Sequence, residues 1–394
     1  MITVASHAAP AVREIAFADC RITPEAQAQA VEAMASGWLT TGPRTALFEQ
    51  SLAAWIGAPH AVAVSSCTAA LEMSLRALGL PVGAPVLTPT LTFCGAVHAI
   101  VHSGLQPVMI DTDEATLTVS PESVAAAART KPAAMIVQHM GGYPVDVATM
   151  AQAAGLPMDR VVEDAAHGLG AALGGQAVGT ASTASCFSFY ATKNLPIGEG
   201  GAITTVDEGL ADRLRVMRQH GMSKDAWRRY EPGSSWRYQV DSDGMKANFT
   251  DLQAAIGLGQ LPYLTAWQIR RAEAAERYTA QLSAVPGITV APQPADGRHA
   301  WHLYVIRVGP EYGRSRDELA MELGARGIGT SVHFIPVHRF GYFRELLGDQ
   351  VHRLPVAERV ADRLLSLPLH PQLGEDDVDY VCAQIADLRA SRRR

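Results

Sequence analysis

The segment CFSFYATKNLPIGEGGAITT, residues 186–205, contains a single lysine, Lys193, within an apolar and hydroxyl-rich run. Removing an ammonium group from water is costly, so a lysine in this setting requires an explanation. Either an opposite charge pairs with it, or its amine is covalently engaged. Two other segments carry groups that could cooperate with Lys193, and in each of them these groups follow a short apolar run that predicts a β-strand.

The first of these segments is AVAVSSCTAALEMSLRALG, residues 61–79. It predicts a strand, a turn of small residues and a helix with Leu71, Leu75 and Leu78 on one face. A helix N-terminus presents free backbone N–H groups and the positive end of the helix dipole, and Ser66 and Thr68 add hydroxyl groups here. The turn could therefore bind a phosphate group, or its side chains could simply cap the helix.

The second segment, RVVEDAAHG, ends an apolar run in Glu163 and Asp164. We expect Glu163 to be structural, whereas Asp164 could be a metal ligand, a ribose-binding residue, the partner of a protonated ring nitrogen, or a structural acid. Pyridoxal 5'-phosphate (PLP) is a cofactor that needs a phosphate cradle, a carboxylate and a lysine together. The sequence thus predicts that Lys193 forms a Schiff base with PLP. Once released, it would be a buried amine with a lowered pKa, suited to moving protons.

Composition narrows the class of protein that must position these groups. The chain has 394 residues, enough for about two domains, and its 48% hydrophobic content and net charge of −6 are typical of a soluble globular protein. The acidic balance and the lack of a basic, aromatic-laced stripe argue against nucleic acid as a partner. Five widely spaced cysteines without a CxxC motif predict neither a disulfide framework nor a zinc site, and they favour a cytoplasmic location.

Short β-branched runs alternate with alanine-rich helical stretches, which predicts an α/β domain with a mostly parallel sheet and a ligand site at the carboxyl ends of its strands. These runs are AVAVSS, APVLTP, PVMIDTD, AAMIVQH, RVVEDAA, ASCFSF and GAITTV. Further on, a long helix leads to PGITVAP, AWHLYVIRV, a helix over 316–326, and GIGTSVHFIP. We therefore expect a large PLP-binding domain over residues 1–265, including an N-terminal segment, and a small α+β domain over residues 266–394.

Residues 77–110 contain no Asp, Glu, Lys or Arg, so they deserve comparison with a membrane span. Four prolines interrupt the segment, at positions 81, 85, 89 and 107, and it also contains histidines, threonines and glycines. Two buried strands separated by a turn and a short helix explain this pattern better. We therefore expect no membrane partner.

Six segments share residue types and order with one known family. They are SGWLTTGPRTALFEQSLAAWIGAPHAVAVSSCTAAL, LTPTLTF, VVEDAAHGLGA, FSFYATKNLPIGEGGAI, NFTDLQAAIGLGQL and GIGTSVHFIPVH. Through them, from about Ala18 to the C-terminus, the chain resembles the DegT/DnrJ/EryC1/StrS aminotransferases, which act mainly on keto sugars attached to nucleotides. The resemblance implies the aspartate aminotransferase-like fold type I of PLP-dependent transferases, and a homodimer with active sites at the subunit interface.

The resemblance assigns roles around the cofactor ring. Lys193 matches the lysine that forms the Schiff base, and Asp164 matches the partner of the pyridine nitrogen. His167 falls where the family has Gln or His near the ring hydroxyl. Phe93 matches the aromatic residue that stacks on the ring face.

The resemblance also assigns the phosphate and substrate ends of the site. Cys67 and Thr68 match the phosphate turn, where SSCT departs from the commoner SGT and replaces a permissive glycine by cysteine. Ser188 matches a serine that bonds the phosphate, and Asn248 matches an asparagine that reaches the phosphate from the neighbouring subunit. His333 aligns with a histidine near the sugar site.

The implied reaction is a transamination in two half-reactions. L-glutamate would give its amino group to the cofactor, and a nucleotide-linked 4-keto-6-deoxy sugar, TDP-4-keto-6-deoxyglucose or a close UDP relative, would accept it. The product would be a 4-amino-4,6-dideoxy sugar for secondary-metabolite or surface-glycan biosynthesis. Three arginines of MSKDAWRRYEPGSSWRY could bind the nucleotide or form a solvated surface: Arg228, Arg229 and Arg237.

Other activities stay open on the sequence alone. A 3-keto sugar or a cyclitol such as scyllo-inosose could be the acceptor in place of the 4-keto sugar. More remote alternatives are a PLP-binding sugar dehydratase, in which a histidine typically replaces the lysine, and a non-catalytic regulatory protein. Lys193 argues against the dehydratase, and the combination of Lys193, Asp164 and Ser188 argues against the regulatory protein.

Overall fold

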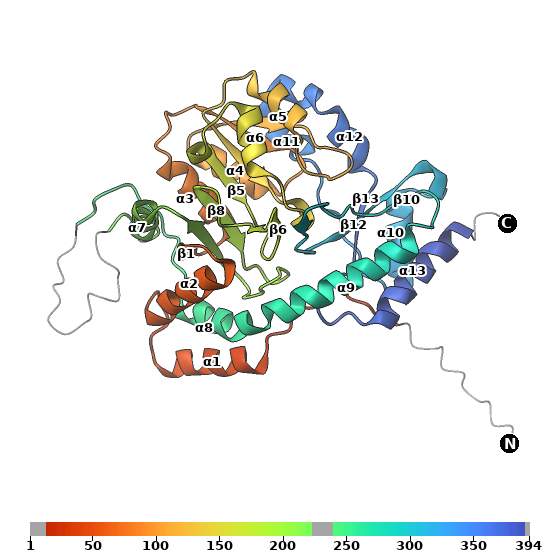
Figure 1. Ribbon diagram of the computed structural model, residues 1–394, viewed down its shortest axis with the longest axis horizontal. Helices are drawn as coiled ribbons and strands as arrows, with labels where there is room; N and C mark the ends of the chain where they lie inside the picture. The colour runs from red at the N-terminus through yellow and green to blue at the C-terminus, as the bar shows by residue number, and fades with distance from the viewer. Residues whose placement is uncertain (1–12, 223–238, 391–394) are drawn as a thin grey trace.

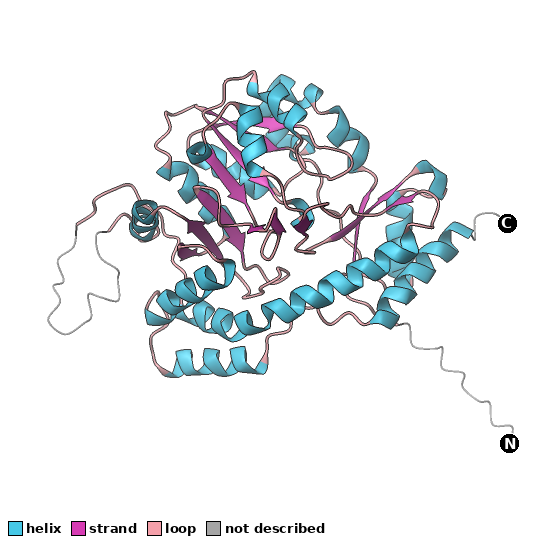
Figure 2. Cartoon of the chain, viewed as in Figure 1, coloured by secondary structure: helices cyan, strands magenta, loops and turns pink. Residues whose placement is uncertain are grey.

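The computed structural model describes residues 13–222 and 239–390. The strands of its central sheet are β1 (His60–Val64), β2 (Pro85–Pro89), β3 (Gln106–Ile110), β4 (Ala134–Gln138), β5 (Val161–Asp164), β8 (Ala184–Ser188) and β9 (Gly201–Thr205). They lie in the order β1-β9-β8-β5-β4-β2-β3. Figure 2 shows the strands in magenta with helices packed around them. Only β9 runs antiparallel to its neighbours, β1 and β8, and the other pairs are parallel. The seven predicted strands and the mostly parallel sheet are therefore confirmed.

Helices cover both faces of this sheet, because side chains alternate between the two faces of each strand. The helices are α1 (Pro24–Ala35), α2 (Pro43–Ile56), α3 (Cys67–Ala77), α4 (Cys94–His102), α5 (Pro121–Ala128), α6 (Val147–Ala154), α7 (Glu208–Met217) and α8 (Asp251–Gln260). Val62 and Val64 of β1 pack in one core with α3, α4 and α7. Ala61 and Ala63 pack in another core with α2 and α8. The result is a layered α/β architecture with β5 at the middle of the sheet.

The C-terminal part forms a second, smaller sheet with its own core. Its antiparallel strands are β10 (Ile288–Thr289), β12 (Tyr304–Val308) and β13 (Leu364–Leu367), and its helices are α9 (Leu264–Leu282), α10 (Arg316–Ala325), α11 (Gly341–Leu347), α12 (Pro355–Ala361) and α13 (Glu375–Ala390). Ile15, from the start of the described chain, belongs to this core and bridges to Ile328. The boundary at residue 265 remains a prediction.

A third sheet is made of three two-residue strands and joins the two parts of the chain. It contains β6 (Ala172–Leu173), β7 (Gln176–Ala177) and β11 (Gly297–Arg298) in the order β11-β6-β7. Near this sheet Arg298 Nε donates to the carbonyl oxygen of Gly170 at 2.7 Å. The segment just before β12 is thereby held against the loop that follows β5.

Helix α9 links the two cores. Figure 1 shows it extending from the end of α8 to the C-terminal sheet. Leu264, at its start, is buried in the core of the large sheet, whereas Tyr278 and Leu282 are buried in the core of the small one. Midway, the buried Arg271 donates to the carbonyl oxygens of Trp301 and Leu369. One rigid element therefore fixes how the small sheet stands beside the large one.

The uncharged segment 77–110 folds as its prolines and polar residues predicted. It supplies β2, α4 and β3, which pack within the central sheet and its helices. Within the described part of the chain, no helix combines the length and hydropathy needed to cross a membrane.

Candidate active site

A cavity of about 480 Å³ opens at the carboxyl edge of the parallel strands. Its walls come from the ends of β4, β5 and β8, the first turns of α3 and α4, and the segments around His302 and His333. The predicted site residues that line it are Cys67, Thr68, Phe93, Asp164, His167, Ser188, Lys193 and His333. Residues separated by more than 260 positions in the sequence thus meet in one place.

Lys193 lies in the turn between β8 and β9, where its backbone N–H donates to the carbonyl oxygen of Tyr190 at 2.9 Å. Its Nζ is 3.5 Å from Nε2 of His302. Burial lowers the pKa of the Lys193 amine to about 8, although Cys67 and Asp164 act in the opposite direction. A larger share of this amine is therefore neutral near physiological pH than for an ordinary lysine.

Asp164 ends β5 and is 4% exposed. Its Oδ1 accepts from the backbone N–H of Ala166 at 3.1 Å and from the Cys67 thiol at 3.9 Å. Burial raises the pKa of the Asp164 carboxyl, more than the Ala166 N–H, Lys193 and His139 together lower it. Among the described residues no cation contacts this carboxylate within ion-pair distance, so it suits a cationic N–H group of a ligand bound in the cavity.

Glu163, next to Asp164, is buried in a separate polar network. The backbone N–H of Val145 donates to Nδ1 of His139 at 3.1 Å, so Nε2 of that ring carries the proton and donates to Glu163 at 2.7 Å. Ser185 Oγ donates to the other carboxylate oxygen at 2.9 Å. Burial raises the pKa of the Glu163 carboxyl, but its hydrogen bonds and its electrostatic interaction with His139 lower this pKa more in sum. Glu163 does not line the cavity, as expected for a structural acid.

The first turn of α3 closes one end of the cavity. Ser66 caps this helix by accepting from the backbone N–H of Ala69 at 3.1 Å, while Cys67 and Thr68 line the cavity. A Cβ atom on Gly201 would lie 2.6 Å from the backbone nitrogen of Cys67, so only glycine allows β9 to approach this turn. Ser188 adds a hydroxyl at the end of β8. The N-terminus of α3 and the hydroxyl groups of Thr68 and Ser188 form a suitable binding site for a phosphate group.

Phe93 precedes α4 and is 59% exposed, with its ring 6.2 Å from that of Phe334. The C-terminal part of the chain fixes the loop before it. The backbone N–H of Val337 donates to the carbonyl oxygen of Thr90 at 2.9 Å, and Nδ1 of His338 lies 2.5 Å from Thr90 Oγ1.

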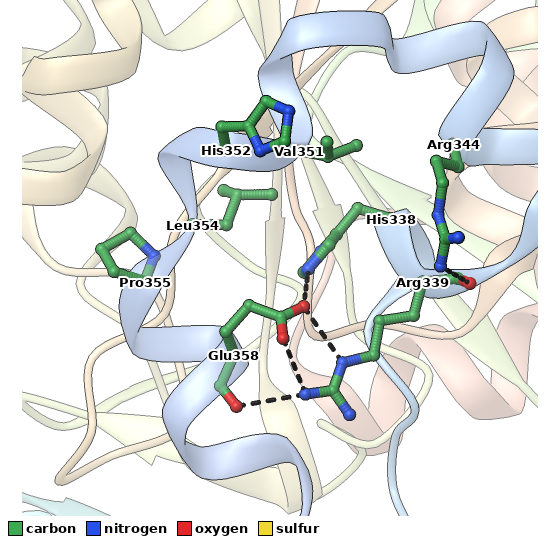
Figure 3. A pocket seen from close by; sticks show the side chains of 8 residues that line it. All are labelled: His338, Arg339, Arg344, Val351, His352, Leu354, Pro355 and Glu358. Atoms are coloured by element: carbon green, nitrogen blue, oxygen red, sulfur yellow. Dashed lines mark hydrogen bonds and ion pairs between the residues drawn. The ribbon is translucent and has the colours of Figure 1, made fainter.

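Figure 3 shows how His338 itself is held, at the wall of a second, smaller pocket. Nε2 of His338 lies 2.6 Å from Glu358 of α12, and the same carboxylate accepts from Arg339. Arg339 also pairs with Asp362. His338 thus joins α12 to the Thr90 loop, and Arg339 is held by two acidic residues at α12 and its C-terminal end.

Three histidine rings surround Lys193. Nδ1 of His167 accepts from the backbone N–H of Gly141 at 3.2 Å, which leaves Nε2 as the protonated nitrogen. The ring of His302 lies 4.4 Å from that of His167, and Nδ1 of His333 contacts Ser366 at 2.9 Å. Burial and the charge of Lys193 lower the pKa of all three rings, for His333 to about 4. The rings are therefore neutral at physiological pH.

Several lining residues were missed by sequence reasoning. They are Leu71, Gly95, Ala96, Gln138, Ala166, Tyr190, Thr192, Glu199, Gly200, His302 and Phe334. His302 had a detectable signal, since it is a polar residue two positions before the mostly apolar strand β12. The sequence offers no reason to place the start of β12 beside Lys193, because that contact depends on how the small sheet stands against the large one.

Two predicted site residues are not found in this cavity. Asn248 does not line it; its amide donates to Thr41 Oγ1 at 2.8 Å and accepts from Lys246 Nζ at 2.7 Å. Arg237, with Arg228 and Arg229, lies outside the described residues. In the described part of the chain, no group of three or more His, Cys, Asp or Glu side chains could hold a metal ion, and the five cysteines are unpaired.

A mostly parallel mixed sheet with a small C-terminal sheet, and a lysine and a buried carboxylate at the carboxyl edge, define a PLP-dependent transferase of fold type I. Comparison with known proteins narrows this class. Residues 21–386 match the DegT/DnrJ/EryC1/StrS aminotransferase family, so the chain belongs to this family. Members of the family are PLP-dependent, and this protein is a sugar aminotransferase.

Individual proteins similar to this chain are consistent with the family assignment. The chain is 45% identical to the spore coat polysaccharide biosynthesis protein SpsC of Bacillus subtilis, over 91% of this chain and 93% of that protein. Its structure resembles the aminotransferase TlmJ from Streptoalloteichus hindustanus with a TM-score of 0.86 and 33% identity, over 96% of this chain and 100% of TlmJ. The putative sugar aminotransferase Spr1654 from Streptococcus pneumoniae, in its PMP-form, gives a TM-score of 0.87 at 28% identity, over 96% and 100%.

Proposed function

We propose that the protein transfers the amino group of L-glutamate to a nucleotide-linked 4-keto-6-deoxy sugar, with TDP-4-keto-6-deoxyglucose as the preferred acceptor. The product would be a 4-amino-4,6-dideoxy sugar. The observation that carries the amino-transfer part of this proposal is the cavity in which Lys193, Asp164 and the first turn of α3 meet. A nucleotide diphosphate would supply binding energy away from the reacting carbon and so position a small keto sugar in the site.

The residues of the cavity fit PLP. The first turn of α3, Thr68 and Ser188 would hold its phosphate, and the exposed ring of Phe93 would cover its flat face. Asp164 is a buried carboxylate with no cationic partner at ion-pair distance in residues 13–222 and 239–390, which suits a protonated pyridine nitrogen. His167 presents a protonated Nε2 for the ring hydroxyl. When bound, PLP supplies the electron sink for carbanion chemistry.

Lys193 performs the proton transfers. In the first half-reaction its neutral Nζ takes a proton from Cα of the amino donor, and in the second it returns a proton to the sugar carbon that bore the keto group. The low pKa of this amine, about 8, suits both directions near neutral pH. The pKa values of the three histidines around Lys193 are lowered, so these rings are poor proton acceptors near neutral pH. The Lys193 amine is the group among the four whose pKa lies nearest to neutral pH.

A homodimer would complete the site. Asn248 lies outside the cavity of its own chain, so we propose that it reaches the phosphate of the neighbouring subunit. The amino-acid donor and the nucleotide part of the acceptor would both bind at the interface between the two subunits. Arg237 would contribute to binding the nucleotide.

A stoichiometric experiment tests the choice of substrate. Protein loaded with the aminated cofactor is mixed separately with TDP-4-keto-6-deoxyglucose, a 3-keto isomer and scyllo-inosose, and the return of the aldehyde absorbance is followed. We expect fast return only with the 4-keto sugar. Fast return only with the 3-keto sugar or the cyclitol would replace the proposed acceptor, and no return with any of them would contradict a role on these sugars.

A further inference from the structure

We propose that His302, fixed by Asn194, is a positioning residue that holds the amine of Lys193 and aims its lone pair at the substrate. This inference rests on the proposed role of Lys193 as the proton-transferring group. It is carried by a chain of hydrogen bonds in which the direction of each bond determines the direction of the next.

The chain begins at the amide of Asn194. Its Nδ2 donates to the carbonyl oxygen of Ala300 at 2.8 Å and lies 3.4 Å from that of Leu169. Both of these partners are acceptors only, so the NH₂ group must face them. Oδ1 of Asn194, which is 4% exposed, is therefore turned the other way, toward His302.

The next step fixes the tautomer of His302. Its Nδ1 lies 3.2 Å from Oδ1 of Asn194, an atom that can only accept. Nδ1 must then carry the ring proton, and the lone pair is on Nε2. Nε2 lies 3.5 Å from Nζ of Lys193, so the histidine accepts from the lysine and not the reverse.

Burial, together with the charge in the surroundings, keeps the His302 ring neutral. The ring is 6% exposed, and the titratable groups around it are Lys193, His167, His333 and Arg271. Burial and then the charge of Lys193 lower the pKa of His302 far below that of a free histidine. The ring cannot take a proton from Lys193 near neutral pH, and it therefore orients the amine without exchanging protons with it.

This orientation matters when Lys193 is a free amine. A neutral amine has two N–H bonds and one lone pair, and a fixed acceptor for one N–H restricts where the lone pair points. The Lys193 amine lines the same cavity as Asp164 and Ser188. His302 thereby reduces the rotational freedom of the group that must meet the reacting carbon.

The experiment compares His302→Leu, which removes the acceptor at similar size, with His302→Gln, whose Oε1 can replace Nε2. In the cofactor-free protein, acylation of Lys193 is followed by peptide mass spectrometry from pH 6 to 10, with the exposed Lys131 as internal reference. The wild-type half-point should lie near pH 8. His302→Leu should lower it by about one unit, because an ammonium without its acceptor is less stable, and His302→Gln should restore it.

A second measurement uses the loaded enzyme. His302→Leu should lower kcat about 10- to 100-fold with little change in KM, and it should increase the kinetic isotope effect for glutamate deuterated at Cα, because proton transfer becomes more limiting. Asn194→Ala should change both readouts in the same direction, and it keeps the test informative if His302→Leu does not fold.

Equal half-points in wild type, His302→Leu and Asn194→Ala would overturn the inference, as would a His302→Gln variant that behaves like His302→Leu. Failure of the proposed function is recognised separately. In that case borohydride would attach the cofactor to a lysine other than Lys193, whatever the half-points are.

Discussion

The floor and the rim of the active site differ in how completely one chain builds them. The floor consists of Asp164, His167, Lys193 and His302, which contact groups of their own chain, and the three residues other than Lys193 are each at most 6% exposed. The rim includes Phe93, which is 59% exposed, and Asn248, which lies outside its own cavity. The floor is thus set by one subunit, whereas Asn248 is proposed to act in the site of a second one.

This difference indicates how variants should behave. A change in the floor should affect the chemical step in every assembly, because no other subunit can supply the missing group. A change at Asn248 of the rim should be rescued when an intact partner provides the same group. The following predictions test the two regions from the largest expected effect to the smallest.

Replacing Lys193 should have the largest effect. Lys193→Ala is expected to reduce transamination by about 10³-fold or more, because the variant lacks both the covalent anchor and the proton-transferring amine. Turnover and the site of borohydride labelling are measured together. Lys131→Asn is the matched control, since Lys131 is exposed and Asn tolerates its positive φ of 57°. A label on another lysine in the wild type would refute the assignment.

Asp164→Asn should keep the fold and reduce turnover by about 10²–10³-fold, the range for removing one preorganised electrostatic group. An amide cannot stabilise the proton on the pyridine nitrogen, so the electron sink weakens. Circular dichroism verifies folding, and single-turnover absorbance gives the rate. Near-normal turnover would mean that another group keeps the ring protonated.

The rim prediction concerns complementation between subunits. Lys193→Ala chains are coexpressed with Asn248→Ala chains, each of which should be poorly active alone. If Asn248 serves the neighbouring subunit, every mixed dimer has one intact site, and random pairing restores about a quarter of the wild-type activity. If Asn248 serves its own chain, no intact site forms and activity stays low, which would remove the proposed distinction between floor and rim.

The smallest effect on the protein is expected at Glu163, which precedes Asp164 of the floor and does not line the cavity. The pKa of Glu163 is lower in the folded protein than its unfolded value, near 4.5. Between these two pKa values the unfolded chain binds more protons than the folded one. The free energy of unfolding therefore falls as the pH falls through this window. Glu163→Gln should therefore cost about 1–3 kcal/mol at pH 7 and progressively less below pH 4.5. Urea unfolding at pH 7 and pH 4 measures both values, and a cost independent of pH would exclude the charged carboxylate as its source.

The sequence predicted the elements whose signals are local. The apolar runs of β1 to β5, β8 and β9 are visible as patterns, and Lys193 and Asp164 stand out because charged groups are rare at the ends of such runs. The helix predicted from its leucine spacing spans residues 67–77, and Gly79 beyond its end has a φ of 62°, which favours glycine after a helix.

Contacts between distant segments could not be predicted in this way. The position of His302 beside Lys193 depends on the packing of β12 against the large sheet, and nothing in the residues around His302 encodes the partner. The same holds for His338, which fixes the Thr90 loop across a separation of 248 residues. Assigning Asn248 and Arg237 requires a second subunit and residues outside the described ranges, so their roles remain predictions.

Helix α9 limits how this protein could be divided. Its first residue, Leu264, is buried in the large core, and Tyr278 and Leu282 are buried in the small one. A chain cut near residue 265 would therefore separate these residues and break the one helix that joins the two cores. Arg271 and its two acceptors, the carbonyl oxygens of Trp301 and Leu369, would stay together in the C-terminal fragment, so the cut would remove the helical link between the two cores and not these hydrogen bonds. For protein engineering, the segment Leu264–Leu282 therefore belongs to both halves, and a split or domain-exchanged enzyme would have to place its junction elsewhere.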